Sequence, residues 1–215
     1  MTYQEVIMSY FILALVLLIG ALVCVPAVRT FFHALCHALY VWAVAKLLGE
    51  QVYARGEYFG RVNGGEWAKE GDNLIVLEGL AHILSVALGA TPKPAGYYLA
   101  LFSGAAAPAA NWTGATFAAA ASEIVSLTEG YTSPTRPAWT PPNSTATNSI
   151  DNMAAVASVT IATAGTLNVT GAALLTGSTR GGTTDKLISA SKYAAPRTFQ
   201  NGDVYEIGYR ISLTV

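Results

Sequence analysis

The stretch Val204-Tyr-Glu-Ile-Gly-Tyr-Arg-Ile-Ser-Leu-Thr-Val215 alternates almost without fault between apolar and polar residues. A period of two is typical of a strand with one face on a hydrophobic core and the other face in water. A shift of one residue would turn every apolar side chain to the solvent, so the pattern also decides which face is buried. We therefore predict a strand over residues 204–215, with Tyr209, Ile211 and Leu213 buried.

Further apolar runs precede this strand, and turn sequences separate them. The runs are residues 96–102, 155–162, 167–176 and 187–193, and the turns include Ala164-Gly165, residues 177–185 and Asn201-Gly202-Asp203. Short strands at such spacing, with Gly, Asn and Asp between them, are typical of a β-sandwich. The prolines within residues 131–149 indicate a loop or an edge there. We predict a mainly β chain with an antiparallel β-sandwich over residues 95–215.

Residues 51–94 are predicted to form a β-hairpin followed by an amphipathic helix. Residues 52–62 and 66–69 have strand character, and Asn63-Gly64-Gly65 between them is typical of a tight turn. Apolar residues then recur at helical spacing up to Gly89, which marks the end of the helix. These residues are Leu74, Leu77, Ala81, Leu84 and Leu88. We expect this apolar face to pack on the sheet, and the stiff Thr91-Pro-Lys-Pro94 linker to end the segment.

Residues 1–50 differ in kind from the rest of the chain. Residues 8–28 contain no charged residue, and this stretch is long enough for a membrane-spanning helix. A second apolar run covers residues 30–45. An acidic leader without Lys or Arg argues against a cleaved signal peptide. Two alternatives stay open: a membrane anchor, and helices enclosed between the subunits of an assembly. Either way, we expect residues 8–45 to be helical, shielded from water and broken near Pro26.

The sequence offers little for catalysis, metal binding or nucleic-acid binding. Charged residues make up 12% of the chain and the net charge is −1, so the basic footprint of a nucleic-acid-binding protein is missing. His33 and His37 lie one helical turn apart beside Cys36, but no third ligand is near, so helix packing is favoured over a metal site. All histidines and cysteines precede the predicted sandwich. We expect no enzymatic activity, no catalytic residues, no metal, no cofactor and no small-molecule substrate.

Several segments resemble, in order and pattern, a recurrent class of tailed-bacteriophage virion proteins. They are residues 71–84 (GDNLIVLEGLAHIL), 97–104 (YYLALFSG), 138–140 (AWT), 149–152 (SIDN), 171–175 (GAALL), 192–198 (KYAAPRT) and 201–203 (NGD). The resemblance covers about residues 50–215 and implies a helix before an aromatic strand, then a β module that ends in an alternating strand. It implies a place in a virus particle, and it does not include the N-terminal apolar segment.

We therefore expect a non-enzymatic virion structural protein that decorates or stabilises the capsid or forms part of the tail. Its partners would be other virion proteins, including further copies of itself in a symmetric oligomer, and residues 8–45 could contact a membrane. One alternative is a host-surface-binding module of a tail tip or fibre, with Tyr131 and Trp139 in the proline-rich loop as contact residues. Another is a protein anchored in the host cell membrane with an external β domain. The expected location is the virion, with the host cell membrane as the alternative.

Overall fold

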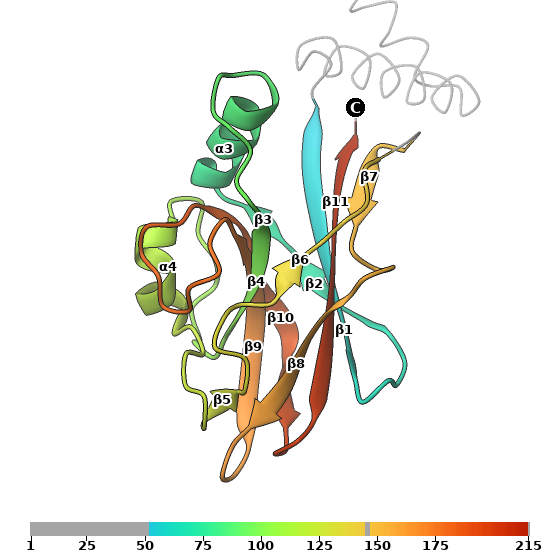
Figure 1. Cartoon of the computed structure of the whole chain (residues 1–215), viewed down its shortest axis with the longest axis vertical. Helices are drawn as coiled ribbons and strands as arrows, with labels where there is room; N and C mark the ends of the chain where they lie inside the picture. The colour runs from blue at the N-terminus through green and yellow to red at the C-terminus, as the bar shows by residue number, and fades with distance from the viewer. Residues whose placement is uncertain (1–51, 145–146, 215) are drawn as a thin grey trace, which may run out of the picture. The chain divides into compact units, whose positions relative to one another are not determined.

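The alternating C-terminal stretch forms β11 (Val204–Thr214), which lies centrally in the first of two antiparallel sheets. The computed structural model describes residues 52–144 and 147–214, here called the β module (Figure 1). Along one side β11 pairs with all of β1 (Tyr53–Val62). On its other side it pairs first with β8 (Ala157–Ala162) and then with β7 (Ser149–Asp151). β11 therefore joins β1 on one side of the sheet to β8 and β7 on the other.

Further strands complete the first sheet, and five strands form the second. In the first sheet, β2 (Ala68–Asp72) pairs with β1 and β5 (Gly130–Tyr131) pairs with β8. The second sheet has the order β3-β10-β9-β4-β6. Its strands are β3 (Leu74–Ile75), β10 (Leu187–Phe199), β9 (Leu167–Leu175), β4 (Tyr97–Phe102) and β6 (Ala138–Trp139).

The inner faces of the two sheets share one hydrophobic cluster, consistent with the β-sandwich predicted from the sequence. The first sheet contributes Tyr58, Tyr205, Ile207 and Tyr209 to it, and the second contributes Leu99, Leu101, Leu174 and Ile188. The described residues contain two helices, α3 (Leu77–Ala87) and α4 (Gly114–Ala121). A second cluster joins α4 to the outer face of the second sheet. Its larger members are Phe102, Trp112, Phe117, Leu175 and Leu187.

The burial of β11 confirms the predicted face but not its predicted depth. Ile207 and Tyr209 are fully buried, whereas Ile211 is only partly buried and Leu213 is 49% exposed. The expectation that Ile211 and Leu213 are buried was therefore wrong. The reason is that the last part of β11 borders an open cavity rather than packed core.

The predicted hairpin forms, and its strands belong to the sheets of the sandwich. Asn63 and Gly64 have φ values of 51° and 70°, the left-handed conformation that a tight hairpin turn requires. Because β1 pairs with β11 and β3 with β10, residues 52–94 supply strands to both sheets. The sequence predicts a sandwich that begins at residue 95. The strands before and after this position pair with each other in both sheets.

The orientation of α3 is the reverse of the one expected from its apolar pattern. The side chains of Leu77 and Leu84 point to solvent, and Gly79 faces the sheet. A Cβ atom at position 79 would overlap the backbone carbonyl of Ile188 in β10, so the helix approaches the strand through its smallest residue. The expected packing of the leucine face on the sheet was wrong because close backbone approach, not side-chain size, selects the contact face.

The segment predicted to be helical, residues 8–45 with its break near Pro26, lies outside the described residues, as do His33 and His37. Neither helix of the β module combines the length and the apolar character that crossing a membrane demands.

Candidate functional site

The most distinctive surface of the β module is a row of exposed leucines along α3. Leu77, Leu80, Leu84 and Leu88 are 63%, 39%, 60% and 85% exposed, and we call them the leucine stripe. Steps of three and four residues place them on one side of the helix. Isolated exposed leucines are common, but a continuous exposed apolar row on a protein surface indicates a contact site.

The orientation of the stripe is fixed by contacts on the opposite side of α3. The Glu78 carboxylate accepts hydrogen bonds from the backbone N–H groups of Gly114, at 2.7 Å, and Leu187, at 2.9 Å. Lys186 adds an ion pair at 3.1 Å. Burial by itself would raise the pKa of Glu78, but these donors outweigh it and the pKa lies below its usual value. Glu78 and the tightly packed Gly79 thus leave the leucines facing outward.

Other exposed apolar residues gather near the stripe. In Figure 1, α3, the start of β1, β7 and the end of β11 lie at the same end of the β module, which we call the α3 end. Besides the stripe, Val52, Tyr53 and Leu213 at this end are between 49% and 66% exposed. Elsewhere in the described chain, Val125 and Leu127 are comparably exposed. Apolar exposure is therefore concentrated at one end.

A cavity of about 670 Å³ opens between the two sheets at the α3 end. Its floor includes Trp139, Leu174 and Ile188 of the second sheet, and Ile150 and Ile211 of the first. Its mouth is formed by residues 140–144 and 147–149, together with Lys93. The floor is thus apolar and comes from both sheets, while the mouth is mostly polar.

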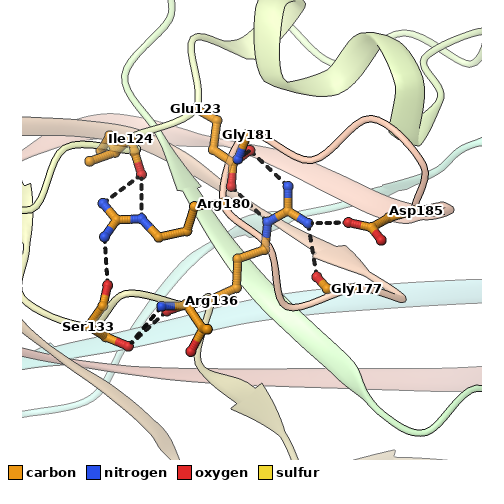
Figure 2. A network of polar contacts seen from close by, with 9 residues as sticks. Glu123, Ile124, Ser133, Arg136, Gly177, Arg180, Gly181 and Asp185 are labelled. Carbon is orange, nitrogen blue, oxygen red and sulfur yellow. Dashed lines mark hydrogen bonds and ion pairs between the residues drawn. The ribbon is translucent and has the colours of Figure 1, made fainter.

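A buried ion pair lies in a different part of the module, among the loops that join the strands (Figure 2). The Arg136 guanidinium donates two hydrogen bonds to the Glu123 carboxylate, at 2.7 and 2.8 Å, and both side chains are fully buried. Arg136 also donates to Asp185 at 2.7 Å and to the Gly177 carbonyl at 2.9 Å. Burial alone would lower the pKa of Arg136, but the hydrogen bonds and charges of Glu123 and Asp185 raise it overall.

Arg180 ties the same loops through backbone groups. It donates to the carbonyls of Ile124, Ser126, Tyr131 and Ser133 at 2.6 to 3.3 Å. Figure 2 shows it beside Arg136, with the two guanidinium groups turned to different partners. Because the charged groups are occupied by one another or by the backbone, the geometry supports a structural role in fixing loops, not acid–base chemistry.

The two residues predicted to contact a partner occupy different environments. Tyr131 is fully buried, and the Arg180 guanidinium lies 3.8 Å from the centre of its ring. Burial raises the pKa of Tyr131 to about 12. Trp139 is 7% exposed and lines the cavity, and its indole N–H donates to the Tyr209 carbonyl at 2.9 Å. The two residues do not form one accessible surface, and partner binding through either stays a prediction.

Sequence reasoning missed the leucine stripe, the cavity and the arginine network. The helical spacing of the leucines was visible, but not the side of α3 that the sheet would take. The cavity and the network bring together residues that are far apart in the chain, so no local sequence pattern predicts them.

Nothing in the comparisons supplies a relative: no known protein family, no curated protein and no solved structure matches the chain. The resemblance to tailed-phage virion proteins therefore rests on the residue patterns alone. Within residues 52–144 and 147–214, no three His, Cys, Asp or Glu side chains are grouped closely enough to hold a metal ion.

Proposed function

We propose that the chain is a non-enzymatic structural subunit of a tailed-bacteriophage particle, decorating or stabilising the capsid or forming part of the tail. Its β module would contact a second copy of itself through the leucine stripe. The stripe is the observation that carries this proposal, because the apolar row on α3 is held facing outward by Glu78 and Gly79. The resemblance of residues 50–215 to virion proteins supports the location in a particle.

The spacing of the stripe favours another helix of the same kind as its partner. The stripe residues Leu77, Leu80, Leu84 and Leu88 are spaced by three or four residues, as residues are on the contact side of two helices that pack side by side. Two copies related by a two-fold axis would bring the same row of each against the other. Low overall charge leaves little repulsion to oppose the contact.

The size of the stripe indicates how strong that contact would be. Fully burying a leucine side chain is worth about 1.5–3 kcal/mol. The partly exposed leucines of two copies would together gain on the order of 10 kcal/mol, which is comparable with the roughly 4–15 kcal/mol cost of association. The stripe would therefore hold two isolated copies weakly. A stable contact is expected where the symmetry of an assembly adds further interactions.

Chemical cross-linking of the full-length chain tests the contact. Cys24 and Cys36 are first replaced by alanine, and single cysteines are then introduced as Leu80→Cys or Leu84→Cys. With a short bis-maleimide, we expect at least one of these variants to give covalent dimers much faster than Thr183→Cys, an exposed loop position outside the stripe. Equal rates at all three positions would refute the α3 contact.

Mass spectrometry of purified particles tests the location. The chain should be present at a fixed copy number, with a high number indicating decoration and a low number indicating the tail. Its absence from particles would refute the structural role, whatever the result of cross-linking.

A further inference from the structure

The cavity at the α3 end has the size and the walls of a site for one small apolar ligand. Its volume of about 670 Å³ falls within the roughly 300–1,000 Å³ of typical ligand sites. Trp139, Leu174 and Ile188 in its floor are 7%, 2% and 2% exposed, so a molecule that reaches them leaves water almost completely. An apolar chain here would continue the core between the sheets and make the dispersion contacts that the walls lack.

The mouth of the cavity has a different chemistry. The side-chain amides of Asn143 and Asn148 have no hydrogen-bond partner within the described part of the chain. Lys93 is the charged residue of the lining, and no ion pair to it occurs among the described residues. Among the residues that the structure describes, no carboxylate lines the cavity. The mouth therefore offers one positive charge and free donors, with nothing acidic to repel an anion.

We propose that this cavity binds a single-chain anionic amphiphile, specifically a long-chain fatty acid. Its hydrocarbon tail would lie on the floor between Leu174 and Ile211, and its carboxylate at the mouth near Lys93. The argument rests on the match between the two zones of the cavity and the two ends of the ligand. It does not depend on the proposed place in a virus particle.

Photolabelling of the full-length chain tests the site directly. The probe is palmitic acid with a diazirine in the middle of its chain, and mass spectrometry maps the labelled residues. We expect label on the cavity lining, within residues 139–144 or 147–150 or on Ile211 or Leu213, and we expect unlabelled palmitic acid to compete for it. Label confined to residues outside the lining would overturn the proposal, including the outcome in which another protein segment fills the cavity.

Two substitutions separate the cavity from non-specific apolar binding. Ile211→Trp places a larger side chain in the cavity and should reduce labelling of the lining at least about tenfold, because filled space excludes the tail. Leu213→Trp, at a half-exposed position of the same lining, serves as a second variant should Ile211→Trp disturb folding. Leu127→Trp, at a half-exposed position outside both the lining and the leucine stripe, is the matched control and should label normally. Equal labelling in all variants would refute the site.

The role of the mouth is tested by charge. In the Lys93→Glu variant we expect palmitic acid to compete about three- to tenfold less well, because an exposed attraction becomes a repulsion. Hexadecanol, which has the same tail and no charge, should compete equally in both proteins. Lys192→Glu, the same charge change away from the cavity, should leave both competitors unchanged. If hexadecanol competes as well as palmitic acid in the parent chain, the preference for an anion is refuted.

Discussion

Replacing Arg136 by methionine should strongly destabilise the β module, and the loss should depend on pH. Arg136 and Glu123 are both fully buried and bond each other twice. Methionine keeps much of the length of the arginine side chain but removes the ion-pair partner of the buried Glu123 carboxylate. Removing one partner of such a pair costs about 3–5 kcal/mol. A domain is typically stable by about 5–15 kcal/mol, so the variant should be close to unfolding at neutral pH.

The pH dependence follows from the two carboxylates, Glu123 and Asp185, that lose their arginine partner. A buried carboxylate without a counter-charge has a raised pKa, because burial favours its neutral form. As the pH falls toward about 4, where carboxylates of the unfolded chain also take up protons, an unpaired carboxylate in the fold costs less stability. The difference in unfolding free energy between the parent and Arg136→Met should therefore be largest at pH 7 and narrow on acidification.

Urea-induced unfolding of the full-length chain, followed by near-ultraviolet circular dichroism, measures this difference at each pH. Arg180→Met is the matched control, since its hydrogen-bond partners are backbone carbonyls that do not titrate. Its deficit should change much less between pH 7 and 4, because Arg180 interacts with Glu123 only through space and makes no hydrogen bond to it. Adding Glu123→Gln to Arg136→Met should recover part of the lost stability at pH 7. If the double variant is no more stable than the single one, and the deficit does not change with pH, the reasoning is refuted.

Three further changes test other parts of the structure. Burial raises the pKa of Tyr131 and of Tyr209 to about 12. Tyrosines of the unfolded chain ionise near pH 10 while these two stay neutral in the folded module, so the unfolding free energy should fall between about pH 10 and 12. Absorbance at 295 nm, which reports all tyrosines of the chain together, should rise further when the protein unfolds in this pH range. Ile207→Asp should cost several kcal/mol in urea unfolding, whereas Leu213→Asp, at a half-exposed position, should cost less than about 1 kcal/mol; equal losses would contradict the burial gradient along β11. Gly79→Val should force α3 away from β10 and speed hydrogen exchange of the α3 amides, and unchanged exchange would show that the close approach is not needed.

The parts of the fold that could be predicted from the sequence are those encoded locally. The alternation along β11 and the Asn63-Gly64 turn each depend on residues within a few positions of one another. The side of the strand to which each side chain points, and the φ values that the turn needs, therefore follow from local residues alone.

The orientation of α3 shows why the packing of a helix on a sheet was harder to predict. Four leucines favoured one side of the helix as the buried side, yet the sheet takes the side of Gly79 and Ile83. The deciding term is how closely the helix backbone can approach Ile188, and that depends on a strand more than 100 residues away in the chain. Periodicity states which residues share a side, but not which side has a partner.

The arginine network and the cavity were beyond sequence reasoning for a related reason. Arg180 serves carbonyls that lie 47 to 56 positions away, and any hydrogen-bond donor of suitable length could in principle serve a carbonyl. The cavity is formed where strands of both sheets end without filling the space between them. A cavity between side chains of different strands cannot be predicted from the local sequence of any one strand.

The central place of β11 has a consequence for how the protein is made. Tyr53 pairs with Thr214, so β1 leaves the ribosome long before the strand that will hold it in the sheet. At about 5–20 residues per second, β1 exposes the edge that β11 later covers for roughly 8–30 s, and β8 exposes its edge for roughly 2–8 s. Nascent chains of this protein should therefore need protection by chaperones until synthesis is nearly finished. A product terminated before residue 204 would keep open edges permanently and would be a target for proteolysis.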